Sequence, residues 1–209
     1  APGTVIVDSS TNTPAMAREV ADAARARGLA HLDAPVSGSV PQSRNRELVF
    51  MVGGDAATLE KAKPVLAAMG RMTVPSGAGA TIKLINNMLS GAMNAAIGEA
   101  ISVATAAGVD TEAAQKVLAE GAAACRLMKT KIPKMLGGDF SPQFQLGLME
   151  KDLRYFLALA QQVDRPVPIT AIVRSQFQAA RRAGLGGLDV SAIFLQASGE
   201  AAKGGGRTA

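Results

Sequence analysis

Residues 79–108 read GATIKLINNMLSGAMNAAIGEAISVATAAG, and this stretch divides the chain into two parts of different character. Apolar residues recur through it at helical spacing, and Gly108 provides a stop. The pattern predicts a helix over 80–107, about 42 Å long at 1.5 Å per residue. β-branched and helical segments alternate before it, whereas only helical patterns follow. We therefore expect an α/β domain over 1–78 and an all-α domain over 79–209, joined by the long helix.

The part before the long helix has the pattern of a parallel sheet with helices. Residues 4–8, TVIVD, form a β-branched run that is typical of a buried strand. Thr13 and Pro14 suit the start of a helix, and Gly28 suits its end. The sequence thus predicts part of a Rossmann-like parallel-sheet domain, with strands over 4–8, 30–38, 47–54 and 71–76 and helices over 14–27 and 56–69.

The part after the long helix has helical patterns alone. Asp110 or Thr111 can cap the first of them, and Asp189 can cap the last. The tail over about 200–209 is rich in glycine and is expected to be frayed. The predicted helices cover 111–120, 126–136, 149–163, 168–183 and 190–199.

Composition and charge exclude several classes of function. Hydrophobic residues make up 48% of the chain and charged residues 19%, enough apolar surface for a folded core. Aromatic residues are only 3%, with no Trp, which argues against a stacking platform for nucleic acid. The net charge of +5 is scattered among acidic residues rather than gathered in a stripe. We expect no nucleic-acid partner, whereas a small anionic substrate or cofactor would suit this charge.

Cysteine use and hydropathy point to a cytoplasmic protein. Cys125 is the single cysteine and His31 the single histidine, so neither a disulfide framework nor a metal site is expected. No apolar run reaches the length of a membrane span, and no signal peptide precedes the first strand. Because the chain starts at Ala1 and enters a strand within four residues, we expect that part of a longer protein is missing.

The long helix carries three polar residues near its start. Lys83, Asn86 and Asn87 stand at positions i, i+3 and i+4, so they share one face of the helix. A lysine shielded from water gives up its proton more easily and can exchange it near neutrality. An ordinary surface lysine whose stem lies along apolar neighbours is the equally open alternative.

Three further polar clusters stand at element ends. Asp8–Thr11, DSST, and Asp33–Ser39, DAPVSGS, each follow a strand, at the edge where open α/β sheets bind ligands. Within the second cluster, Ser37 and Gly38 offer a hydroxyl and open backbone N–H groups to an anionic oxygen. The third cluster is the Lys151–Asp152 pair before an apolar helical run. A capping loop, a plain turn and a solvated helix face are the respective alternatives.

Taken together, these motifs resemble the β-hydroxyacid dehydrogenase family, which includes 3-hydroxyisobutyrate dehydrogenase, tartronate semialdehyde reductase and, more remotely, 6-phosphogluconate dehydrogenase. The motifs are DSST, LDAPVSG, MVGG, GATIKLINNM, EKDL and LDVSAIF, in register from residue 4 to about 196. The resemblance implies a Rossmann-like domain that binds NAD or NADP, followed by an all-α domain. It also implies a homodimer or homotetramer that acts on a small hydroxy acid or semialdehyde.

The resemblance also implies roles for individual residues. Lys83, in the KxxNN motif, would be the general acid/base for the substrate hydroxyl. The expected substrate-binding residues are Asn86, Asn87, Ser37 and Gly38, and the expected cofactor-binding residues are Thr11 and Lys151.

The sequence departs from the family pattern in two places. After PVSG it reads SVPQSRNRE instead of a small glycine-containing loop, so Arg44 and Arg46 either contact an acidic substrate group or belong to a solvated loop. The GxGxxG phosphate loop with which the family begins does not occur in the required strand context. Two rival functions therefore stay open. One is a catalytically silent oligomerisation or scaffold module, and the other is imine reduction on a related scaffold.

Overall fold

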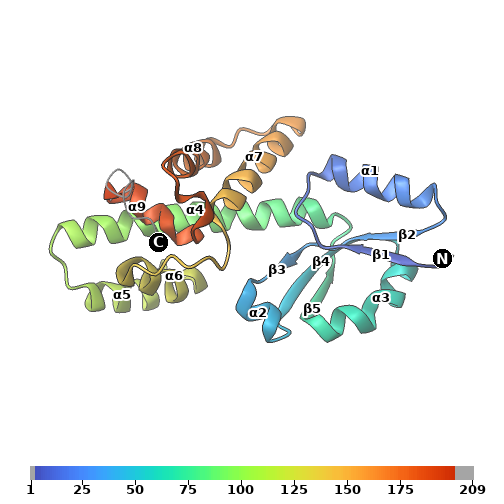
Figure 1. Ribbon diagram of the computed structural model, residues 1–209, viewed down its shortest axis with the longest axis horizontal. Helices are drawn as coiled ribbons and strands as arrows, with labels where there is room; N and C mark the ends of the chain where they lie inside the picture. Colours follow the sequence, from blue (N-terminus) through green and yellow to red (C-terminus); the bar gives the residue numbers. More distant parts are fainter. Residues whose placement is uncertain (1–2, 201–209) are drawn as a thin grey trace. The chain divides into compact units, whose positions relative to one another are not determined.

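The computed structural model describes residues 3–200 of the chain, which divides into two compact units (Figure 1). Unit 1 contains the residues up to Asn87 together with Tyr155–Pro166, and unit 2 contains Met88–Arg154 and the residues from Val167 onward. The boundary falls inside α4 (Gly79–Ala106), the long helix that the sequence predicts over 80–107. The fold class, an α/β part followed by an all-α part with a long helix between them, is confirmed.

Unit 1 is built on a five-stranded sheet of mixed direction. Its strands are β1 (Val5–Asp8), β2 (Ala30–Asp33), β3 (Val36–Ser37), β4 (Leu48–Gly54) and β5 (Gly70–Pro75). Their order is β1-β2-β4-β3, with β5 paired to β4. The β1/β2 and β4/β5 pairs are parallel, whereas β4 runs antiparallel to both β2 and β3.

The sheet therefore differs from the expected wholly parallel one. The predicted strand over 30–38 is also broken into β2 and β3. Between β3 and β4 the chain forms only α2 (Val40–Arg44), which is too short for the crossover that a parallel neighbour requires. The chain instead turns back on itself and pairs antiparallel.

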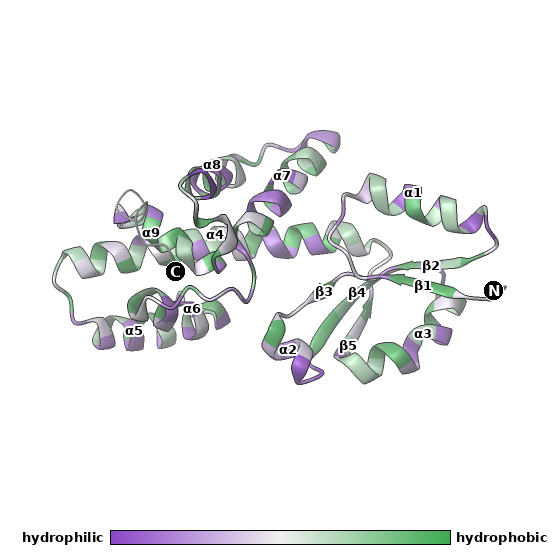
Figure 2. Cartoon of the chain, in the orientation of Figure 1, coloured by the Kyte–Doolittle hydropathy of each residue, from purple (hydrophilic) through white to green (hydrophobic). Residues whose placement is uncertain are grey.

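Two helices flank this sheet. α1 (Pro14–Arg25) starts after Thr13, whose Oγ1 accepts a hydrogen bond from the Met16 amide at 3.2 Å. α3 (Ala56–Met69) starts in the same way after Asp55. Figure 1 shows α1 and α3 on opposite sides of the strands. The core of unit 1 lies between the sheet and α3, and β4 at its centre is coloured hydrophobic in Figure 2. Its buried members are Leu32, Ala34, Phe50, Val52, Leu59, Ala62 and Leu66.

Unit 2 consists of helices around one apolar core. Four of them lie wholly in this unit: α5 (Thr111–Glu120), α6 (Arg126–Gly137), α8 (Pro168–Arg182) and α9 (Ile193–Ala197). The unit also contains α4 from Met88 onward and the first part of α7 (Leu146–Gln162), up to Arg154. Large side chains from five of these helices fill the core, among them Ile101, Ile132, Met149, Phe177 and Phe194. Across the described residues 3–200, no helix is both long enough and apolar enough to cross a membrane.

The end of the chain differs from the single helix predicted over 190–199. Asp189 caps a short 3-10 turn, Val190–Ala192, and only then does α9 begin. The Asp189 carboxylate accepts from the Ser191 amide two residues on, at 3.1 Å, which closes a tighter turn than an α-helix has. The predicted frayed tail, apart from residue 200, lies outside the described residues.

Candidate active site

The polar face near the start of α4 is buried. Lys83 is 9% exposed and Asn87 4%, and the half-buried Asn86 donates from Nδ2 to the Asn87 Oδ1 at 3.1 Å. The apolar residues beside them are more exposed, with Ile82 at 39% and Ile85 at 38%. A surface helix normally has the reverse arrangement. Lys83 is therefore not an ordinary surface lysine, because the helix turns its polar side inward.

The first turn of α4 is fixed to the end of β2. The Ala80 amide donates to Asp33 Oδ2 at 2.7 Å, so Asp33 satisfies one of the open amides at this helix start. A Cβ on Gly79 would lie 2.4 Å from the Asp33 carbonyl oxygen and 2.5 Å from that of Met51. Only glycine allows the helix to approach the strand ends this closely. Lys83 thus stands one turn beyond a rigid junction between helix and sheet.

Burial perturbs the carboxyl group of Asp33. Its desolvation raises the pKa above the ordinary value, and the hydrogen bond from the Ala80 amide offsets this only in part. A carboxylate at a helix N-terminus also interacts favourably with the helix dipole. Asp33 therefore has a structural task at this junction, in addition to its position at a strand end.

The segment after β2 carries Ser37 and Gly38 along the edge of β4. Ser37 pairs with Val49 in the β3/β4 ladder and is half-buried, whereas Gly38 is exposed. Gly38 has φ +128°, and a Cβ there would lie 2.8 Å from Cδ2 of Leu48. The next amide, of Ser39, donates to the Gln42 Oε1 at 2.9 Å. This turn therefore requires glycine, and it leaves a hydroxyl and a bare backbone at the end of β3.

The loop after β1 is an ordered turn around Asp8. The Ser10 amide donates to Asp8 Oδ1 at 2.9 Å, and Asn12 Nδ2 donates to Oδ2 at 3.4 Å. Burial raises the pKa of Asp8, but the hydrogen bonds from Ser10 and Asn12 and the interaction with His31 together outweigh it, so the net pKa is below the ordinary value. Capping of α1 is done by Thr13, not by this turn. Thr11 is half-buried within the turn, and the cap does not require it.

Lys151 belongs to unit 2, on α7. Its Nζ lies 3.1 Å from Oδ1 of Asp152, and the side chains are 29% and 1% exposed. A buried carboxylate is not part of a solvated helix face, which was the alternative for this pair. Arg44 and Arg46 are both exposed, in agreement with a solvated loop.

Unit 1 therefore holds all but one of the predicted site residues: Thr11, Ser37, Gly38, Lys83, Asn86 and Asn87. Sequence reasoning missed the task of Asp33 at the start of α4. The two bonded groups are 47 residues apart, and no local pattern marks the pair. A capping residue is normally recognised because it directly precedes its helix, and Asp33 does not.

Two family models match the chain. Residues 1–81 match the NAD binding domain of 6-phosphogluconate dehydrogenase, and residues 77–196 match the NAD-binding domain of NADP-dependent 3-hydroxyisobutyrate dehydrogenase. Both describe NAD-binding domains, in agreement with the expected cofactor class, NAD or NADP.

Two curated relatives and one solved structure that are similar to the chain also carry the names of hydroxy-acid dehydrogenases. The chain is 34% identical to 2-(hydroxymethyl)glutarate dehydrogenase of Eubacterium barkeri, over 92% of this chain and 65% of the relative. It is 36% identical to 3-hydroxyisobutyrate dehydrogenase of Pseudomonas aeruginosa, over 90% and 67% respectively. The crystal structure of 3-hydroxyisobutyrate dehydrogenase from Salmonella typhimurium superposes with a TM-score of 0.86 at 31% identity, covering 93% of this chain and 70% of that one. The chain thus spans about two thirds of the length of these proteins.

Proposed function

Because the chain belongs to the β-hydroxyacid dehydrogenase family, we propose that it carries the catalytic and substrate-binding residues of an NAD(P)-dependent oxidoreductase. The reaction interconverts a small 3-hydroxy acid and its semialdehyde. The observation that carries this proposal is the burial of Lys83, at 9% exposure, on the inward polar face of an otherwise apolar helix. Withdrawing a cation from water is unfavourable, and such placements are common at catalytic sites.

Lys83 acts on the substrate hydroxyl. Its amine accepts the hydroxyl proton while the carbon–hydrogen bond on the same carbon breaks, and in the reducing direction the ammonium returns the proton to oxygen. A bound nicotinamide supplies the acceptor for the hydride. The rigid junction at Gly79 and Asp33 supports this role, because proton transfer requires a donor and an acceptor held at hydrogen-bond distance.

Ser37 and Gly38 hold the substrate carboxylate. The turn at Gly38 leaves a backbone free of side chain, and the Ser37 hydroxyl can donate to an anionic oxygen. Asn87, together with Asn86, orients the hydroxyl from the face that carries Lys83. Short, negatively charged hydroxy acids suit this set of donors.

Thr11 and Lys151 contact the cofactor. Thr11 lies half-buried just beyond the carboxyl end of β1, where open α/β sheets bind nucleotides. Lys151 supplies a partly exposed cation, which suits an anionic ligand.

The protein assembles as a homodimer or a higher homo-oligomer through α4. Ile82, Ile85, Leu89 and Met93 are each between 38% and 48% exposed, and they recur at helical spacing. Such a row of exposed apolar side chains is a common feature of an interface between protein chains.

Reduction of NAD and NADP by the product of the complete gene tests the proposed reaction. We expect reduction with 3-hydroxyisobutyrate and related 3-hydroxy acids, and no oxidation of NADPH with cyclic imines. Turnover of imines but not of hydroxy acids would replace the proposal with imine reduction. Inactivity with both, despite tight cofactor binding, would also overturn it.

A further inference from the structure

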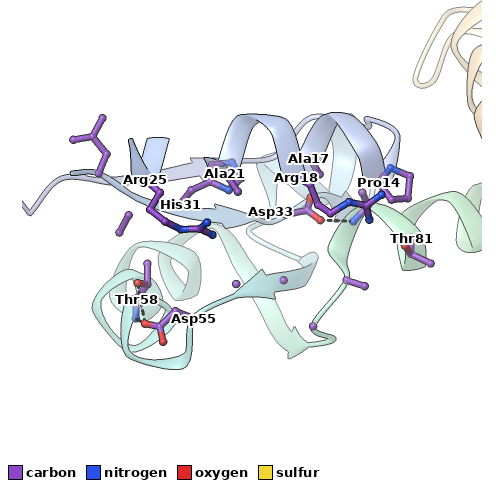
Figure 3. A pocket seen from close by; sticks show the side chains of 17 residues that line it. Pro14, Ala17, Arg18, Ala21, Arg25, His31, Asp33, Asp55, Thr58 and Thr81 are labelled. Carbon is purple, nitrogen blue, oxygen red and sulfur yellow. Dashed lines mark hydrogen bonds between the residues drawn. The ribbon is translucent and has the colours of Figure 1, made fainter. Parts of the chain in front are cut away.

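A cavity of about 520 Å³ opens on the α1 side of the sheet in unit 1 (Figure 3). Side chains from α1 and β2, the turn at Gly53–Asp55 and the start of α4 form its walls. Neither Lys83 nor Ser37 nor Gly38 nor Thr11 lines it. Its volume falls within the range of small-molecule sites, roughly 300–1,000 Å³. The residues of the proposed reaction therefore do not form the wall of this cavity.

Two arginines line this cavity from the same helix. Arg18 and Arg25 stand two turns apart on α1, so they share one side of it at a spacing of about 10 Å along the axis. Figure 3 shows both extending from α1 beside the strand residues His31 and Asp33. Within residues 3–200, Arg18 takes part in no ion pair. Among the described residues, Arg25 pairs only with Asp22, in a bridge whose side chains are 78% and 68% exposed. Such a bridge is weak and easily exchanged.

His31 lines the cavity from β2 and has an unsatisfied atom. Its Nε2 is buried and has no hydrogen-bond partner among the described residues. A buried polar atom without a partner is unfavourable, and native proteins usually satisfy it with a ligand or water. His31, on the strand that follows α1, therefore adds an unused hydrogen-bonding atom to the wall of this cavity.

Two acidic residues also line the cavity, but both are already engaged. Asp33 accepts the Ala80 amide at 2.7 Å at the start of α4. Asp55 accepts the amide and hydroxyl of Thr58 at 2.8 and 3.1 Å at the start of α3. A carboxylate at a helix N-terminus is partly compensated by the helix dipole. The uncommitted charge that faces the cavity is therefore positive.

We propose that this cavity binds an elongated organic anion with an acidic group at each end. Carboxylate or phosphate groups about 10 Å apart pair with Arg18 and Arg25, since guanidinium groups bind both kinds of anion through paired hydrogen bonds. A hydroxyl or carbonyl of the same ligand bonds to Nε2 of His31. A short hydroxy acid cannot reach both arginines, so this ligand differs in length from the substrate of the proposed reaction.

Calorimetric titration of the chain with dicarboxylates of increasing length tests this proposal. The series succinate, adipate, suberate and sebacate, with the matching alkanediol bisphosphates as a second arm, varies only the spacing and the kind of acidic group. We expect affinity to rise with length up to suberate or sebacate. Arg18→Gln and Arg25→Gln should each weaken binding of the longer ligands about threefold to tenfold. The better arm then identifies the acidic group.

Arg27→Gln is the matched control, because Arg27 is an exposed arginine near the end of α1 that does not line the cavity. We expect it to leave the affinities within twofold. Equal losses in all three variants, or affinities that do not depend on length, would mean general attraction to a basic protein and would overturn the proposal. Absence of binding to both series would overturn it as well.

Discussion

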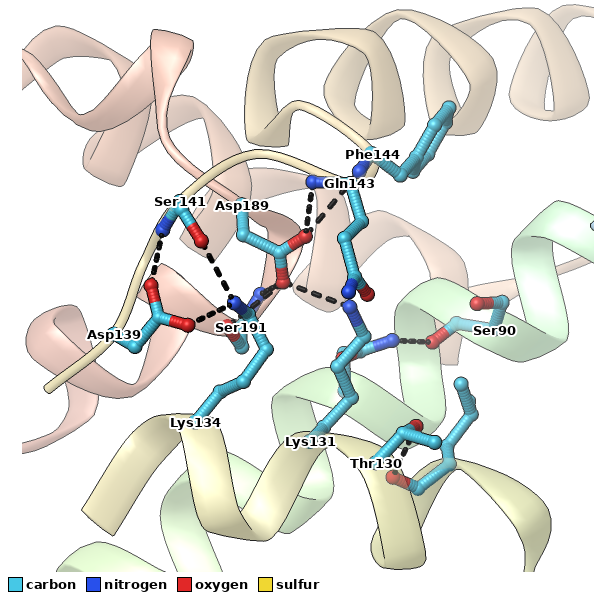
Figure 4. Close-up of polar contacts among 12 residues, drawn as sticks. Ser90, Thr130, Lys131, Lys134, Asp139, Ser141, Gln143, Phe144, Asp189 and Ser191 are labelled. Atoms are coloured by element: carbon cyan, nitrogen blue, oxygen red, sulfur yellow. Dashed lines mark hydrogen bonds and ion pairs between the residues drawn. The ribbon is translucent and has the colours of Figure 1, made fainter. Parts of the chain in front are cut away.

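A buried ion pair in unit 2 allows a clear test of what stabilises the fold of that unit. Lys131 Nζ lies 2.8 Å from Asp189 Oδ1, with side chains 8% and 0% exposed (Figure 4). Oδ1 also accepts from the Ser191 amide and hydroxyl at 3.1 and 2.8 Å. Oδ2 accepts the amides of Gln143 and Phe144 at 3.0 and 3.2 Å. One carboxylate therefore joins α6, the segment that leads into α7, and the turn before α9.

Asp189→Ala would leave the Lys131 ammonium buried without its partner. Breaking a buried pair in this way costs about 3–5 kcal/mol. The two amides that donate to Oδ2 also lose their acceptor, and each buried unsatisfied donor costs about 1–3 kcal/mol. These terms overlap, so we expect the free energy of unfolding of unit 2 to fall by at least about 3 kcal/mol. Asp189→Asn retains an acceptor oxygen and should lose less.

The pair should also make unit 2 sensitive to acid. Burial raises the pKa of Asp189, but the bonds from Lys131 and Ser191 outweigh it, so its pKa lies below the ordinary 3.8. A depressed pKa in the folded state means that the stabilisation is present above pH 3.8 and is lost as pH falls through the folded value. The free energy of unfolding of the wild type should therefore decline below about pH 4. Asp189→Asn should decline less steeply.

Amide hydrogen exchange, read residue by residue, measures these changes within unit 2. Glu112→Ala is the matched control, because it breaks the exposed Glu112–Lys116 bridge in the same unit. We expect it to cost less than about 0.5 kcal/mol. If Asp189→Ala also cost less than about 1 kcal/mol, the inference that this carboxylate joins three segments of unit 2 would be wrong.

Three further predictions concern unit 1 and assembly. Asp33→Ala removes the acceptor of the Ala80 amide at the start of α4 and should lower the free energy of unfolding by about 1–2 kcal/mol. Asp33→Asn keeps an acceptor oxygen and should lower it less. Urea titration measures both losses. Gly38→Ala places a Cβ 2.8 Å from Leu48 on a backbone with φ +128°, so it should lower the free energy of unfolding by about 1–3 kcal/mol. Gly137→Ala is the control and should not lower it, because Gly137 lies in α6 and has open space around it. Ile85→Glu puts a charge on the exposed apolar side of α4 and should shift the mass by light scattering towards the monomer. An unchanged oligomer would show that this side is not the interface.

Local patterns were enough to predict most of the secondary structure. α3 has the predicted bounds, and α4 and α6 differ from theirs by a residue, because capping residues and glycines stand at their ends. α7 begins at Leu146, three residues before the predicted start at 149, since Gly147 lowers the helical signal there. The strand direction was not predictable in the same way. It depends on how the chain turns between β2 and β4, and periodicity carries no information on direction.

The candidate site was predictable in its residue types but not in its supports. The spacing of Lys83, Asn86 and Asn87 predicted one shared face, and the structure shows that this face is buried. The spacing alone could not decide between a buried and a snorkelling lysine, because that depends on what packs against the helix. The bond from α4 to Asp33 joins groups far apart in sequence and has no local signature.

Single-turnover kinetics of the complete gene product test the central claim, that Lys83 transfers the proton, most directly. Hydride transfer from a bound 3-hydroxy acid would be followed by nicotinamide absorbance in the wild type, in Lys83→Met and in Lys63→Met, which changes a lysine that is 53% exposed on α3. We expect Lys83→Met to slow the step by about 10²-fold or more with substrate and cofactor affinity largely retained, and Lys63→Met to match the wild type. A rate within tenfold of the wild type in Lys83→Met would contradict the claim.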